Sequence, residues 1–176
     1  MKIYFLAIPV IIGILFGSIM ITTQEDSSTD SMILNKKNLF EGSSILGNPN
    51  AKISIVEFGD YQCTFCYKFH KDTMKMIVKQ YVVDGEVNFV YKDFPLNGPS
   101  SMMASEASYC AQEQGKFWEY HDIIYENWEG ENTGWVTRDA LGRFAENVEL
   151  DMNEFNSCMN DSKYQQKVLK NEEFAR

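Results

Sequence analysis

The sequence predicts an α/β fold, with a small parallel sheet followed by a set of helices. Three observations carry this prediction. The run 52–58 is β-branched and almost wholly apolar, which is typical of a strand buried on both faces. Apolar positions at helical spacing follow from 63 to about 81, and a second strand-like run occupies 87–91. Strand, helix and strand in that order predict a right-handed unit with two parallel strands.

After residue 98 the pattern indicates helices only. The first two are expected at 100–114 and 116–128, with Gly115 marking the end of the first. Thr137 and Asp151 are side chains of the kind that cap the start of a helix, and each is expected to open a further one. A last helix, capped by residue 161 or 162, is expected to continue to the end of the sequence.

Composition restricts the possible partners. A chain of 176 residues with 44% hydrophobic residues can fill the core of a domain. The formal net charge is −9, and Lys and Arg form no cluster long enough for a phosphate-binding stripe. Nucleic acid is therefore not an expected partner.

The N-terminal segment predicts export. Residues 3–21 form an apolar run of 19 residues without charges, preceded by Lys2 and followed by acids. As a helix this run is about 28 Å long, against roughly 30 Å for the hydrocarbon core of a bilayer. Residues 1–21 are therefore expected to be a transmembrane anchor, the alternatives being a cleaved signal segment or a buried soluble helix. Either of the first two places the rest on the extracytoplasmic side, anchored or secreted.

A linker is expected between the apolar segment and the folded part. Residues 22–44 begin with a stretch rich in Ser, Thr and acids, which is typical of a solvated tether. Within the linker, 32–44 is a candidate for a short edge strand. The folded part is expected to begin near Ile45, with the strand–helix–strand unit over 45–98 and a helical part over 99–176.

Two cysteines stand at the corner between the first strand and the helix. Cys63 and Cys66 form a C-x-x-C pair immediately after the Gly59–Asp60 turn. Unpaired backbone N–H groups and the helix dipole favour a thiolate at Cys63, so Cys63 is the expected nucleophile and Cys66 its resolving partner. The alternatives for such a pair are half of a zinc site or a tight structural disulfide.

An acidic residue lies one position before the end of the first strand. Glu57 is flanked by apolar residues, so it is expected either at a rim or buried with a raised pKa. The functional interpretation is a proton acceptor for Cys66. The alternative is an acid solvated at the strand end.

The other two cysteines lie in the helical part. A disulfide between Cys110 and Cys158, 48 positions apart, would stabilise the fold by roughly 4 kcal/mol. Free buried thiols or a metal site are the alternatives, and zinc would require convergence with the C-x-x-C pair or His70. His70 and His121 are expected to be surface or packing residues, and the acidic loop 126–131 a solvated face. Neither a cofactor nor a metal is expected.

Several linked motifs resemble the DsbA-like thiol:disulfide oxidoreductases of the thioredoxin superfamily. The resemblance covers about 45–176 and implies a thioredoxin-like fold with an inserted helical domain. It also implies that the first cysteine exchanges with substrate disulfides while an acid at the Glu57 position assists proton transfer. The motifs are Gly47-Asn48-Pro49-Asn50-Ala51, Val56-Glu57-Phe58-x-Asp60-Tyr61-Gln62-Cys63-x-x-Cys66, Lys92-Asp93-Phe94-Pro95-Leu96 and Cys110-Ala111-x-x-Gln114-Gly115-Lys116-Phe117-Trp118.

One part of the family pattern has no counterpart here. The family continues after the helical domain with a Thr-Pro or Val-Pro loop, whose cis proline faces the cysteines, then a β-hairpin and a final helix. The prolines of this sequence are Pro9, Pro49, Pro95 and Pro99. The expectation is a truncated chain that lacks the proline loop, the C-terminal β-hairpin and the last helix.

The leading functional hypothesis is an exported thiol:disulfide oxidoreductase acting as an oxidase. It would exchange a Cys63–Cys66 disulfide with exported cysteine-containing proteins through a mixed disulfide at Cys63, and a membrane redox partner would recycle it. The alternative hypothesis is a non-catalytic exported binding or assembly module whose cysteines are structural or bind zinc.

Overall fold

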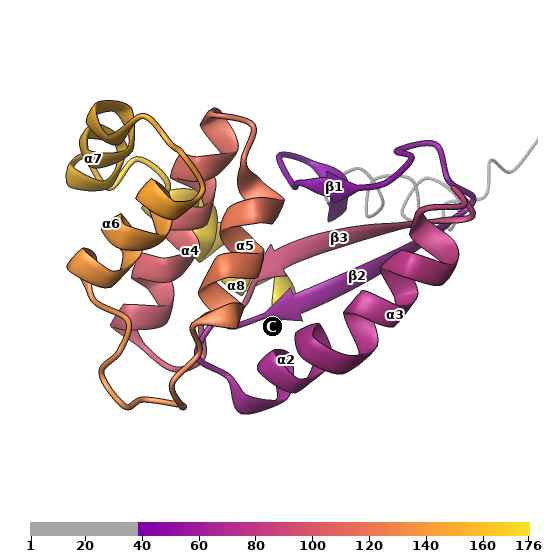
Figure 1. The fold of residues 1–176 in the computed structure, drawn as a ribbon, viewed down its shortest axis with the longest axis horizontal. Coiled ribbons are helices and arrows are strands. Elements are labelled where there is room, and N and C mark those ends of the chain that lie inside the picture. Colours follow the sequence, from indigo (N-terminus) through magenta and orange to yellow (C-terminus); the bar gives the residue numbers. More distant parts are fainter. Residues whose placement is uncertain (1–38) are drawn as a thin grey trace, which may run out of the picture.

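A computed structural model describes residues 39–176 of the chain (Figure 1). Three strands and a series of helices follow one another along this part. The strands are β1 (Ile45–Leu46), β2 (Ile53–Gly59) and β3 (Val87–Asp93). A continuous helical run between β2 and β3 comprises α2 (Thr64–Lys68), η1 (Phe69–Met74), α3 (Lys75–Ile77) and η2 (Val78–Val82). The remaining helices are α4 (Pro99–Glu113), α5 (Phe117–Glu126), α6 (Arg138–Asn147), α7 (Met152–Asn160) and α8 (Gln165–Ala175).

The strands form a sheet in the order β1-β3-β2. β2 and β3 are parallel, with a register that runs from Ile53 opposite Val87 to Gly59 opposite Asp93. β1 joins the other edge of β3 in the antiparallel direction. The predicted strand–helix–strand unit with parallel strands is therefore confirmed.

The predicted strand at 52–58 is confirmed as β2, but the expected burial on both faces is wrong. β2 lies at the edge of the sheet among the described strands, only Gly59 in it is fully buried, and Ile53 at its start is 59% exposed. The central strand is β3, in which every residue is buried. An apolar run does not distinguish a central strand from an edge strand, because the order of strands depends on pairing between distant segments.

Helices cover both faces of the sheet. The run from α2 to η2 packs on the face that carries Ile55 and Phe89, where the Phe69 and Phe89 rings lie 6.1 Å apart. Because side chains alternate along a strand, Glu57 projects toward that same face. On the opposite face, α8 stacks the Phe174 ring at 6.1 Å from Phe58. Glu57 is thus directed toward the helix that carries the C-x-x-C pair.

Helices α4 to α7 gather beyond the carboxyl ends of β2 and β3 (Figure 1). A disulfide between Cys110 and Cys158 joins α4 to α7, with 5.8 Å between the two Cα atoms. Thr137 caps α6 by accepting the Ala140 N–H, and Asp151 caps α7, so both predicted caps are confirmed. The predicted start of the last helix is wrong, because the chain turns at 161–164 and α8 begins only at Gln165.

The start of the chain was predicted to anchor it in a membrane. The predicted anchor at 1–21 and most of the linker lie outside the described residues. Within 39–176, no helix is long and apolar enough to cross a bilayer. The candidate edge strand at 32–44 does not occur over 39–44, and the strand pairing begins at Ile45 instead.

Candidate active site

The C-x-x-C pair occupies the corner between β2 and α2. Cys63 is the N-cap residue of α2, with an extended backbone, and its N–H donates to the Asp60 carbonyl at 3.0 Å. Cys66 lies within the first turn of α2. Both are free thiols and half-buried. The sequence predicted this corner. Cys63 is accessible there, at the N-terminal, positive end of the α2 helix dipole.

The pKa of Cys66 differs from that of an ordinary thiol because Cys66 is partly buried. Burial is the main cause that raises the pKa of Cys66 to about 12; the nearby Cys63 and Glu57 also raise it, and a backbone hydrogen bond at Asp60 lowers it. A thiol in this state keeps its proton at neutral pH. Cys66 therefore requires a proton acceptor before it attacks another sulfur, and a proton donor when it leaves one.

Glu57 is a carboxyl whose charge acts on Cys66. Burial raises its pKa from 4.5 to about 8, and its Oε2 atom is buried without a hydrogen-bond partner among residues 39–176. The charge of Glu57 contributes to the raised pKa of Cys66, which means that the two groups are electrostatically coupled. A carboxyl that titrates near pH 8 exchanges protons readily in either direction.

The turn before Cys63 is held by a buried carboxylate that sequence reasoning missed. Asp60 is 1% exposed and accepts three hydrogen bonds. Its Oδ1 accepts the Gln62 N–H at 2.7 Å and the Ser101 hydroxyl at 2.6 Å, and its Oδ2 accepts the Asn97 N–H at 2.7 Å. The turn is thereby fixed to the loop after β3 and to the first turn of α4.

Gln62 adds a second set of contacts between the same segments. Its side-chain amide donates to Ser101 Oγ at 2.9 Å, and its backbone carbonyl accepts the Trp128 indole N–H at 3.1 Å. The Tyr125 hydroxyl donates to the Asp60 carbonyl at 3.3 Å. The Tyr125 and Trp128 side chains therefore hold the backbone of the active-site turn.

The acidic loop 126–131 is not simply the solvated face that the sequence predicted. The Glu131 carboxylate accepts the Thr64 N–H at 3.1 Å and the Thr64 hydroxyl at 3.3 Å. A residue 67 positions away thus supplies the side-chain cap that Cys63 does not provide. No local motif predicts this contact, because it forms only when the helical part folds against the C-x-x-C corner.

Glu131→Gln is expected to make Cys63 more reactive. A negative charge at the start of α2 opposes a thiolate beside it, and the amide removes that charge while keeping an oxygen that accepts from Thr64. Alkylation of Cys63 by iodoacetamide near pH 6, in a Cys66→Ser background, should become about two- to fivefold faster. Glu129→Gln is the matched control, since Glu129 is exposed in the same loop. An unchanged or slower rate in Glu131→Gln would contradict this role.

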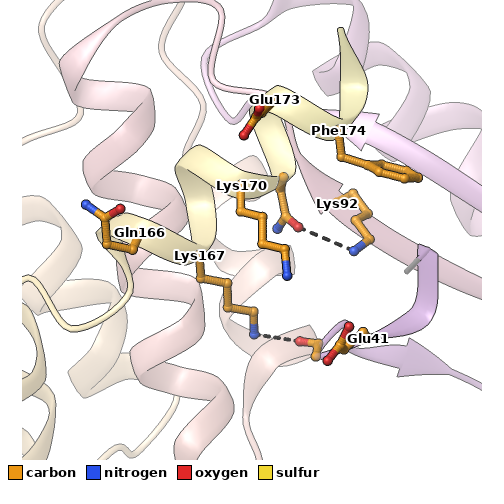
Figure 2. A pocket seen from close by; sticks show the side chains of 9 residues that line it. Glu41, Lys92, Gln166, Lys167, Lys170, Glu173 and Phe174 are labelled. Carbon is orange, nitrogen blue, oxygen red and sulfur yellow. Dashed lines mark hydrogen bonds between the residues drawn. The ribbon is translucent and has the colours of Figure 1, made fainter. Parts of the chain in front are cut away.

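A separate cavity of about 750 Å³ lies between α8, β3 and the segment before β1 (Figure 2). Three lysines line it. Lys92 donates to Asn171 Oδ1 at 3.3 Å, and Lys167 donates to the Gly42 carbonyl at 2.6 Å. Burial lowers the pKa of Lys167 to about 8. Neither cysteine of the C-x-x-C pair lines this cavity, so it is distinct from the thiol site.

Comparison with known proteins identifies the family. Residues 40–176 match a family model described as "Thioredoxin". "Disulfide bond formation protein D" of Bacillus subtilis is 31% identical over 110 residues, which is 61% of this chain and 50% of that protein. "Probable disulfide bond formation protein D" of Bacillus cereus is 26% identical over 177 residues, which is 98% of this chain and 79% of that protein. The chain thus spans about half the length of the first of these relatives.

Solved structures agree with this assignment. The crystal structure of oxidised BdbD from Bacillus subtilis superposes with a TM-score of 0.71 at 26% identity, covering 76% of this chain and 74% of that one. The predicted thioredoxin-like α/β fold is therefore confirmed. From the family match, the named relatives and the C-x-x-C pair at the start of α2, the chain belongs to the DsbA-like thiol:disulfide oxidoreductases of the thioredoxin family.

Proposed function

We propose that this chain is an exported oxidase that transfers a Cys63–Cys66 disulfide to cysteine-containing proteins. The observation that carries the proposal is that the two thiols differ in position and in pKa. Cys63 stands half-exposed at the helix end, whereas burial raises the pKa of Cys66. The position of Cys63 at the start of the helix favours it as the sulfur that a substrate thiolate reaches, and the raised pKa of Cys66 means that Cys66 needs a proton as it leaves.

Disulfide transfer to a substrate proceeds in two thiol–disulfide exchange steps. A substrate thiolate attacks Cys63 Sγ of the oxidised pair, the Cys63–Cys66 bond breaks, and Cys66 leaves with the electron pair and takes up a proton. A second substrate thiolate then attacks the substrate sulfur of the mixed disulfide and releases the Cys63 thiolate. The substrate loses two electrons and the protein gains them, so a membrane redox partner would have to remove these electrons before the next cycle.

Glu57 would move the proton at Cys66. Its pKa of about 8 leaves most of the carboxyl protonated at neutral pH, so it is able to donate when Cys66 departs. In the reverse direction the ionised carboxylate accepts the Cys66 proton. The single group thus serves as acid in substrate oxidation and as base when Cys66 resolves a mixed disulfide.

The surface beside Cys63 suits an unfolded polypeptide. Phe65, between the two cysteines, is 77% exposed, and Leu96 is 58% exposed. Leu96 belongs to the loop that the Asn97 N–H fixes to Asp60, which brings this loop against the active-site turn. Exposed apolar side chains near a reactive sulfur favour substrates whose cysteines are not yet buried.

The test is oxidation of a peptide that contains two cysteines, followed by mass spectrometry. The oxidised chain should convert the dithiol peptide to its disulfide, Cys63→Ser should not, and Cys66→Ser activated as a mixed disulfide should retain a single-cysteine peptide at Cys63. If the wild-type chain oxidises no dithiol and Cys63 forms no mixed disulfide, the proposed function is wrong.

A further inference from the structure

Three side chains with metal-ligating atoms converge where η1 meets α5. His70 comes from η1, and His121 and Asp122 are consecutive on α5. His70 Nε2 lies 2.8 Å from Asp122 Oδ1, and His121 Nδ1 lies 3.5 Å from the same oxygen. One ligand atom from each residue lies within 4.8 Å of the others. These residues come from opposite sides of the boundary between the C-x-x-C helix and the helical part.

His121 is the unusual member of this cluster. Its side chain is fully buried, and neither ring nitrogen has a hydrogen-bond partner among the described residues. Its surroundings are largely aromatic: the Tyr91 and Tyr125 rings lie 4.7 and 5.0 Å from it, both edge to face. A buried polar group without a partner is costly, and such groups usually have a water or an ion that satisfies them.

The protonation states suit metal binding. Burial lowers the pKa of His121, which keeps the imidazole neutral with a free lone pair. The hydrogen bond from His70 and the nearby His121 ring lower the pKa of Asp122 despite its partial burial, so its carboxylate is ionised. Neutral imidazole and carboxylate are the forms in which these side chains bind metals.

We propose that His70, His121 and Asp122 form a binding site for a divalent transition metal ion, with zinc(II) as the expected occupant. Zinc binds imidazole nitrogen and carboxylate oxygen at about 2.0–2.2 Å, so its ligands in a tetrahedral site lie about 3.4 Å apart. Two of the three separations lie near that value: 2.8 Å for the hydrogen-bonded His70 and Asp122, and 3.5 Å for His121 and Asp122. The third lies within 4.8 Å, so a bound ion would replace the His70–Asp122 hydrogen bond and draw the ligands to similar distances. Imidazole ligands select zinc over calcium and magnesium, which prefer sites built entirely from oxygen.

The exposure of the three residues provides an entry path and an open position. The Asp122 side chain is 50% exposed, whereas those of His70 and His121 are 3% and 0% exposed. An ion would therefore approach past Asp122, and a water molecule on that side would complete four-coordination. The bound ion would clamp η1, which continues directly from the redox-active α2, to α5.

Zinc binding to the chain without its C-x-x-C thiols tests this site independently of the proposed function. The full chain with Cys63→Ser and Cys66→Ser removes the competing thiolates, and the disulfide occupies Cys110 and Cys158. We expect one zinc ion per chain by titration calorimetry, and a visible absorption band of four-coordinate cobalt(II) when cobalt replaces zinc. Zinc should also raise the melting temperature of this protein.

Three further substitutions locate the site. Asp122→Asn, at a half-exposed position, should weaken zinc affinity at least about tenfold. His121→Phe keeps an aromatic ring in the cluster and should abolish both the cobalt band and the thermal shift, whereas Asp72→Asn, an exposed acid on η1, should change neither. The proposal fails if zinc binds more weakly than about 1 mM, or if Asp122→Asn binds zinc as tightly as its parent. If His121→Phe does not fold, the result with Asp122→Asn decides.

Discussion

Replacing Cys110 and Cys158 together by Ala is expected to lower the free energy of unfolding by about 4 kcal/mol. The disulfide joins α4 to α7 across 48 positions, so without it the unfolded chain regains the entropy of a loop of that length. Domains of this size are stable by about 5–15 kcal/mol, so the loss is a large fraction of the total. Denaturant unfolding followed by circular dichroism measures the change.

This measurement requires a background without the second pair of thiols. In Cys63→Ser/Cys66→Ser protein, a reductant acts on the Cys110–Cys158 bond alone, so reduction should cause the part of the loss that comes from the cross-link. Both cysteines are buried, at 1% and 5% exposure, so loss of packing adds to the loss of the cross-link in the Ala variant. A change below about 1 kcal/mol would contradict the prediction.

Glu57→Gln is expected to remove a pH dependence of stability and to slow proton transfer at Cys66. The pKa of Glu57 is about 8 in the folded protein and 4.5 in its ordinary state. Between these values the folded protein binds a proton that the unfolded chain has released, so stability decreases as pH rises through the window. The wild type should lose up to about 3 kcal/mol between pH 5 and pH 8, and Glu57→Gln should not show this loss.

The slower proton transfer expected in Glu57→Gln also follows from the loss of the carboxyl. A mixed disulfide prepared at Cys63 with a chromophoric thiol reports the attack of Cys66. Its resolution should accelerate with pH until Glu57 is ionised near pH 8 and then level off. Glu57→Gln should be slower by about 10²-fold at pH 8 and show no plateau there. Glu86→Gln, an exposed acid before β3, is the control and should behave as the wild type. A plateau that persists in Glu57→Gln would exclude the carboxyl as the proton acceptor.

The sequence predicted the features that depend on local pattern. The corner at Cys63, the parallel strand pair and the caps at Thr137 and Asp151 each follow from a few consecutive residues. The position of β2 at the sheet edge did not follow, because pairing partners are distant in sequence. The start of α8 was also missed, since the chain at 161–164 forms turns rather than the expected cap.

In the candidate site, too, the residues with a local sequence signal were predicted and those that depend on distant contacts were not. Cys63, Cys66 and Glu57 were predicted because each stands at a recognisable position relative to the strand end and helix start. Asp60 and Glu131 were missed, because their roles depend on contacts across 41 and 67 positions respectively. The one available signal was Asp60 itself, an acid directly after the strand-end Gly59, which was interpreted only as part of a turn.

The Asp60 carboxylate has a consequence for transplanting this chemistry to other proteins. It accepts hydrogen bonds from the active-site turn, the Asn97 loop and Ser101 of α4. The position of the cysteines therefore depends on residues that follow them by more than thirty positions. A C-x-x-C pair grafted with only its own strand and helix would keep the hydrogen bond from Gln62 to this acid but lose those from Asn97 and Ser101. The smallest portable unit of the redox centre therefore includes the Asn97 loop and the first turn of α4 as well as β2 and α2.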